Sequence, residues 1–166
     1  MRTINQSIFT YSELSEGAQE KARGLFKDGH QYSWVDEGID SVKAFCKHYG
    51  VTMKDYSLSP YAHSYIETNA DNQSFRGLSL KQLEKDQDLM PTGYCIDSDL
   101  FITMYESTYV NGGNALEGFK QAIDAGMKAI LSDMEYQDSD EYITETIECN
   151  DYEFYEDGSF YKESKA

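Results

Sequence analysis

The chain has 166 residues and a mass of 19.0 kDa, which is enough for one domain with its own apolar core. Hydrophobic residues make up 40% and aromatic residues 14% of the chain, a composition that excludes a disordered acidic tail. Thirty acidic residues face 14 basic ones, and the formal net charge of −16 argues against direct binding of nucleic-acid phosphates or of anionic lipid.

The first part of the chain predicts two helices followed by two strands. The run 8–11 is suited to an edge strand, and apolar residues at helical spacing predict a helix over 13–27. Over 33–49 the apolar residues step by four, three, four and three, which predicts a second helix with one apolar face. The pattern then changes to alternation, so we expect strands over 51–58 and 62–67.

The middle of the chain is polar over 69–77, which is typical of a loop. Ser79 can cap a short helix that Pro91 closes. The apolar runs 94–96 and 100–105 favour strands.

The last third predicts two helices and a hairpin. A long amphipathic helix is expected over 115–135, and the spacing of Asp138 and Glu141 predicts the cap of a shorter helix. Residues 152–161 predict a hairpin that turns at an Asp-Gly pair. Strands and helices are mixed instead of strictly alternating. The expected fold class is therefore α+β, a single domain with a small antiparallel sheet packed against about four to five helices.

The charge is concentrated in the second half of the chain. Residues 1–85 carry 11 acids and 10 bases, whereas residues 86–166 carry 19 acids and four bases. Between residues 129 and 161 there are 11 acids and no Lys or Arg. Duplex DNA carries one negative charge per about 1.7 Å, and a helix rises about 1.5 Å per residue. Carboxylates in a line can therefore imitate a nucleic acid.

This pattern favours a non-enzymatic interaction protein that needs no cofactor. Its acidic part would occupy the basic surface of a protein that handles nucleic acid, without binding nucleic acid itself. The expected contact residues are acids of the last third, namely Asp138, Asp140, Glu141, Glu145, Glu148, Asp151, Glu153, Glu156 and Asp157.

Two motifs lie near the ends of the chain, YSELSEGAQEKA at 11–22 and ECNDYEFYEDG at 148–158. They resemble the opening and closing segments of a group of small acidic bacteriophage-encoded proteins of unassigned function. The resemblance implies a phage or mobile-element setting. In that setting the chain would inhibit a host nucleic-acid-processing or defence system, of the restriction or CRISPR kind, by binding it.

Metal and disulfide chemistry find little support in the sequence. The carboxylate pairs at 97–99 and 138–140 lack the further oxygen ligand and the glycine that a calcium loop requires. The three cysteines are widely spaced and form no zinc or disulfide pattern. No apolar run resembles a signal peptide or a membrane span, so we expect a location in the reducing cytoplasm of a bacterial host and no membrane partner.

Other classes of function stay open. A small enzyme would need a nucleophile beside a base, and His63 and Cys95, with Tyr65, are the candidates for such a pocket. An antitoxin-like acidic partner of a basic protein would carry the same charge. Adaptation to salt would explain the charge without any partner. The oligomeric state does not follow from the sequence.

Overall fold

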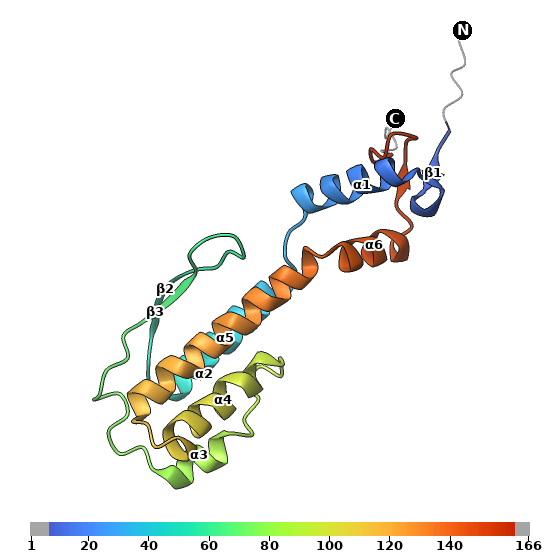
Figure 1. Cartoon of the computed structure of the whole chain (residues 1–166). Coiled ribbons are helices and arrows are strands. Elements are labelled where there is room, and N and C mark those ends of the chain that lie inside the picture. The colour runs from blue at the N-terminus through green and yellow to red at the C-terminus, as the bar shows by residue number, and fades with distance from the viewer. Residues whose placement is uncertain (1–6, 162–166) are drawn as a thin grey trace, which may run out of the picture. The chain divides into compact units, whose positions relative to one another are not determined.

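The computed structural model describes residues 7–161 and contains six α-helices and four short strands within that range. The expected α+β class is confirmed. The antiparallel pairing takes the form of two separate two-stranded sheets. Contacts divide the described chain into two compact units (Figure 1): unit 1 comprises residues 7–32 and 136–161, and unit 2 comprises residues 33–135.

Unit 1 brings the first and last segments of the described chain together. It contains β1 (Phe9–Thr10), a 3₁₀ turn (Tyr11–Glu13), α1 (Glu16–Gly29), α6 (Asp140–Cys149) and β4 (Glu153–Phe154). β1 and β4 pair antiparallel, and Phe154 also forms a bridge with Phe160. The hairpin predicted over 152–161 is therefore confirmed, and it is joined to the strand predicted at the start of the chain.

Serine hydroxyls cap both helices of unit 1. Ser15 Oγ accepts a hydrogen bond from an amide in the first turn of α1 at 3.4 Å, and Ser139 Oγ does so in α6 at 3.2 Å. The prediction that Asp138 caps α6 is wrong by one residue. The carboxylate of Asp138 accepts a hydrogen bond from the Tyr32 hydroxyl instead.

The core of unit 1 lies between α1, α6 and β4. Its buried members are Tyr11, Leu14, Ala18, Ala22, Ile143, Ile147 and Phe154. Ile143 and Ile147 stand one turn apart on α6, which packs against α1. Full burial of such a side chain contributes about 1.5–3 kcal/mol. These two residues are therefore the main attachment of α6.

Unit 2 contains the longer helices. Its elements are α2 (Val35–His48), β2 (Met53–Ser57), β3 (Tyr65–Thr68), α3 (Leu80–Asp86), α4 (Ile96–Tyr105), a π-helical segment (Glu106–Val110) and α5 (Ala115–Gln137), whose last two residues belong to unit 1. The sequence predictions for α2, the β2–β3 pair, α3 and α5 are confirmed. None of the helices within residues 7–161 combines the length and apolarity that a bilayer crossing requires.

The prediction of strands over 94–96 and 100–105 is wrong, because this segment forms α4. Its buried apolar residues follow helical spacing: Ile96, Leu100, Phe101 and Met104. A short run that is apolar at most positions does not distinguish a buried helix from a buried strand. Here α4 is covered by both α2 and α3, so apolar residues lie on more than one of its faces.

Aromatic rings and small residues hold the core of unit 2 together. The ring of Phe45 on α2 stacks on Phe119 of α5 with centroids 5.2 Å apart, and it meets Phe101 of α4 edge-on at 5.0 Å. Gly38 lets α5 approach α2, since an added Cβ would lie 2.7 Å from Ile130 Cγ1. Cys46 is buried in this core, and burial raises the pKa of its thiol to about 12.

Candidate acidic binding surface

Three of the nine expected contact acids are held inside unit 1 by cations of α1. Within its described residues, unit 1 has 13 acidic residues and only three basic ones, Lys21, Arg23 and Lys27. Each of the three lies within 4.0 Å of a carboxylate oxygen from the C-terminal part of the chain. The local cations are therefore all used to join α1 to that part.

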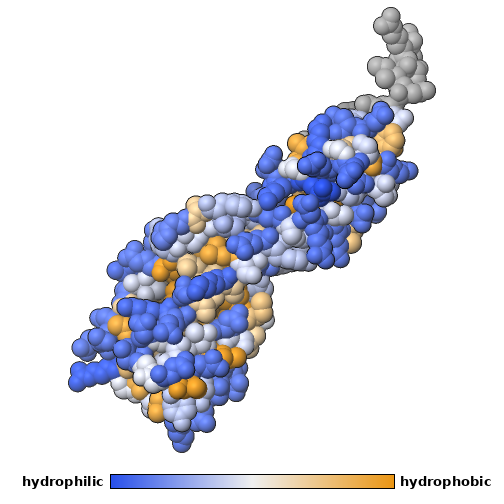
Figure 2. Space-filling view, in the orientation of Figure 1, coloured by the Kyte–Doolittle hydropathy of each residue, from blue (hydrophilic) through white to orange (hydrophobic). Residues whose placement is uncertain are grey.

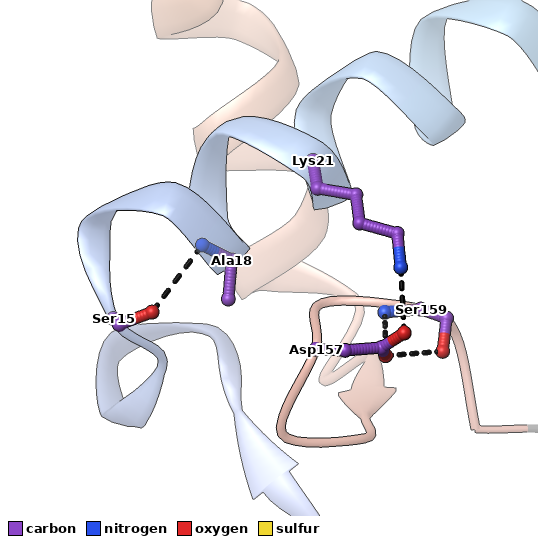
Figure 3. A network of polar contacts seen from close by, with 5 residues as sticks. All are labelled: Ser15, Ala18, Lys21, Asp157 and Ser159. Carbon is purple, nitrogen blue, oxygen red and sulfur yellow. Dashed lines mark hydrogen bonds and ion pairs between the residues drawn. The ribbon is translucent and has the colours of Figure 1, made fainter.

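Asp157 is the most constrained of these acids (Figure 3). Its Oδ2 lies 2.6 Å from Lys21 Nζ, and its Oδ1 accepts hydrogen bonds from the hydroxyl and the amide of Ser159 at 2.6 and 3.0 Å. The bond from Lys21, supported by those from Ser159, holds the pKa of Asp157 well below its usual range. Asp157 therefore shapes the hairpin turn and ties it to α1.

Asp138 and Asp140 flank the start of α6. The side chain of Asp138 is only 7% exposed; Oδ2 lies 3.9 Å from Lys27 Nζ and 2.8 Å from the hydroxyl of Tyr32. The side chain of Asp140 is 79% exposed, and its Oδ2 lies 3.4 Å from Arg23 Nε. Asp138 is thus a structural residue, whereas Asp140 stays accessible but has its charge compensated.

The other six expected contact acids are exposed and form no ion pair with any of residues 7–161. They are Glu141, Glu145, Glu148, Asp151, Glu153 and Glu156. On the side shown in Figure 2, hydrophilic residues cover most of unit 1. Six of the ten unit 1 acids that form no ion pair with any of residues 7–161 are therefore carried by α6 and the segment after it.

Three of the six acids form a stripe along α6. Glu141, Glu145 and Glu148 are four and three residues apart, so they share one side of the helix, away from the buried Ile143 and Ile147. At about 1.5 Å per residue, this stripe has one carboxylate per roughly 5 Å. One strand of DNA has a phosphate per about 3.4 Å of axis. The stripe thus has about two-thirds of the charge density of one DNA strand.

The stripe leads into a hollow of about 350 Å³. Glu148, Asp151 and Glu153 line this hollow, and Tyr152 forms part of its wall. Among residues 7–161, no group of three His, Cys, Asp or Glu residues is placed to hold a metal ion. We call the five residues Glu141, Glu145, Glu148, Asp151 and Glu153 the acidic face; Glu156 lies outside it, in the hairpin turn.

A larger hollow of about 620 Å³ lies at the C-terminal end of α1. Its walls include Phe26, His30, Tyr152, Phe160 and Tyr161. The rings of Phe26 and His30 stack with centroids 5.5 Å apart, and Tyr152 meets Phe26 edge-on at 6.1 Å. We call this hollow the aromatic cavity. Sequence patterns do not reveal this cavity, because its residues come from segments more than 100 positions apart and no spacing within either segment indicates it.

The residues of the enzyme alternative do not line a common cavity. Tyr65 lines a hollow of about 270 Å³ with residues of α5 such as Phe119, but His63 and Cys95 are not among its lining residues. His63 stacks on Tyr65 at 6.2 Å, and the Tyr65 hydroxyl donates to Asp55 Oδ2 at 2.8 Å. Cys95 is exposed at the start of α4 and forms no hydrogen bond with His63.

Comparison of the chain with protein-family models, curated proteins and solved structures finds no match. The resemblance to bacteriophage proteins therefore stays an expectation. The function has to be inferred from the charges and hollows of the chain itself, and both are most pronounced in unit 1.

The constraint on Asp157 predicts a change of stability with pH. We expect Asp157→Asn to remove a contribution that is present above the ordinary carboxyl pKa of about 4 and declines as pH falls towards the lowered folded value. The difference in free energy of unfolding between wild type and variant should be constant near neutral pH and shrink below about pH 4. Urea unfolding between pH 7 and about pH 2 measures it. Asp151→Asn is the control, because Asp151 is exposed without an ion pair in residues 7–161. A difference that stays constant into strong acid would contradict the prediction.

Proposed function

We propose that this protein is a non-enzymatic inhibitor of phage or mobile-element type. It binds a basic host protein that processes nucleic acid or acts in host defence, and it does so through the acidic face of unit 1. The observation that carries the proposal is the acidic face itself: five exposed carboxylates that form no ion pair with any of residues 7–161.

The physical argument begins with the cost of placing these charges together. Like charges one helical turn apart destabilise a helix by about 0.2–0.5 kcal/mol per pair. In unit 1 the cations of α1 are engaged elsewhere and do not relieve this repulsion. A basic surface laid on the acidic face removes the repulsion and speeds association by electrostatic steering. Binding of this kind weakens steeply as salt rises.

A second candidate is an antitoxin-like partner of one small basic protein. The hollow lined by Glu148, Asp151 and Glu153 favours it, because a hollow of this size admits single cationic side chains. The phosphate-binding channel of a nucleic-acid-binding protein is a broad basic surface and would not enter such a hollow. Both candidates use the same carboxylates. They differ in the partner. In the first candidate the partner binds nucleic acid on the same surface that the acidic face covers, and in the second candidate it binds no nucleic acid there.

The test compares two variants that lose the same charge. In the first, Glu141, Glu145 and Glu148 are changed to Gln. In the control, Glu84→Gln, Asp88→Asn and Glu106→Gln remove three exposed acids of unit 2 that form no ion pair in residues 7–161. The full chain and both variants are immobilised and used to capture partners from a bacterial host lysate at rising salt. Captured partners are then challenged with duplex and single-stranded DNA.

We expect wild type and control to retain the same partner. The stripe variant should bind it about tenfold less tightly, because each of the three exposed charges contributes roughly 0.2–1 kcal/mol to binding. Added DNA should displace the partner. A partner that binds both variants equally overturns the proposal. A salt-sensitive partner that binds no nucleic acid favours the antitoxin-like candidate.

A further inference from the structure

We propose that the aromatic cavity of unit 1 receives an arginine side chain of the basic partner, while the neighbouring acidic hollow takes a second cation from the same partner segment. This inference rests on the proposed function, and it specifies what that function leaves open: the chemistry of the segment that binds. The ligand is an extended basic peptide in which arginine is preferred to lysine.

The first step is the shape and lining of the aromatic cavity. Five of its eight lining residues carry an aromatic or imidazole ring, and its volume of about 620 Å³ is ample for a long side chain. Phe26 and Tyr152 contact each other edge-on, so their ring faces point in different directions around the cavity. Ring faces attract cations, and a planar guanidinium stacks on them more readily than a strongly hydrated ammonium group does.

The second step is the charge around the cavity. Gly29, the last residue of α1, is part of the lining, so the cavity lies at the carbonyl end of that helix, where the helix dipole favours positive charge. The described residues of unit 1 contain 13 acids against three bases, and the three bases are paired. An anionic ligand is repelled by this surface, and a neutral apolar ligand gains nothing from it. A cation with a flat apolar face is attracted by the negative charge of unit 1 and can also stack on the rings of the cavity.

The third step is the position of Tyr152. Its side chain is 41% exposed, and it lines the aromatic cavity as well as the hollow formed with Glu148, Asp151 and Glu153. The two hollows are therefore neighbours that share one wall. A peptide lying across Tyr152 places one side chain against the rings and the next cation among the carboxylates.

The experiment uses three capped five-residue peptides. One has arginine at its second and fourth positions, the second has lysine there, and the third has serine. Each is titrated into the full chain at low salt while NMR signals of His30 and Tyr152 are followed. We expect the arginine peptide to bind roughly two- to fivefold more tightly than the lysine peptide, which is the size of an exposed cation–π contribution. The serine peptide should not bind.

Variants of Tyr152 separate ring chemistry from bulk. Tyr152→Leu should remove the preference for arginine, and Tyr152→Phe should keep it, because phenylalanine retains the ring face. The matched control is Tyr136→Leu, which changes another exposed tyrosine of unit 1 that does not line the cavity. The control should leave the preference unchanged.

The outcomes distinguish this inference from the proposed function. Salt-sensitive binding of both charged peptides with equal affinity overturns the aromatic site but leaves the acidic face in place. Failure of every peptide to bind overturns both. Binding that emerges only after residues 162–166 are removed would identify the occupant as the chain's own end, which contains Lys162 and Lys165, and would overturn a partner arginine.

Discussion

Replacement of Gly158 by alanine should destabilise unit 1 by about 3 kcal/mol or more, the sum of two costs. Gly158 has a φ of +81°, and a side chain in that region costs about 1–2 kcal/mol. An added Cβ would also meet the backbone carbonyl of Ala18 in α1, and such overpacking costs about 1–3 kcal/mol. Neither partner moves easily, because Gly158 lies in the hairpin turn beside Asp157 and Ala18 lies within a helix.

The control for this prediction is Gly24→Ala. Gly24 also lies in unit 1, on α1, but an added Cβ there has no atom within 4 Å. Alanine is the better helix former, so this change should stabilise the chain by up to about 1 kcal/mol. Urea unfolding measures the free energy of unfolding of each variant, and hydrogen exchange shows which helices lose protection. Gly158→Ala should speed exchange in α1 and α6 and leave α2 and α4 unchanged. Stability within about 0.5 kcal/mol of wild type would contradict the close approach of the turn to α1.

Local chemistry explains why most elements could be predicted from the sequence. The caps of α1 and α3 are serine hydroxyls, each of which accepts a hydrogen bond from the backbone amide three residues later. The apolar residues of α2 lie on one face of the helix. These signals lie within a few residues of the elements that they define. In the α4 segment the helical spacing of the buried residues is obscured, because contact with both α2 and α3 places further apolar residues between them.

The acidic surface was only partly predictable, because charge compensation here is a tertiary effect. The sequence between residues 129 and 161 contains no Lys or Arg, so every acid in it looks unopposed. The fold brings α1 alongside and compensates Asp138, Asp140 and Asp157 with cations more than 100 positions away. The grouping of Glu141, Glu145 and Glu148 on one side of α6 follows from their spacing of four and three residues, a signal that the sequence does carry.

Removal of the Asp97 carboxylate by Asp97→Ala should destabilise unit 2 by about 3 kcal/mol, because three hydrogen bonds to a buried charged acceptor are lost together. Asp97 is fully buried, and its Oδ2 accepts three hydrogen bonds: from the amide and hydroxyl of Thr92 at 2.8 and 2.9 Å, and from the amide of Gly93 at 3.0 Å. The Thr92 hydroxyl also lies 2.8 Å from Ser41 Oγ on α2. One carboxylate oxygen therefore closes the loop before α4 and links it to α2.

Two further variants identify the source of this loss. Asp99→Ala changes an exposed acid in the same turn of α4 and should stay within about 0.5 kcal/mol of wild type. Asp97→Asn keeps an acceptor oxygen for the three donors. It removes the negative charge and places an NH2 group where Oδ1 stands, an atom that forms no hydrogen bond with any of residues 7–161. It should therefore cost clearly less than alanine. Equal losses for Asp97→Asn and Asp97→Ala in urea unfolding would show that the charge, and not the acceptor geometry at Oδ2, holds the loop. The expected order instead identifies the hydrogen bonds accepted by Oδ2 as what holds Thr92 and Gly93 against the first turn of α4.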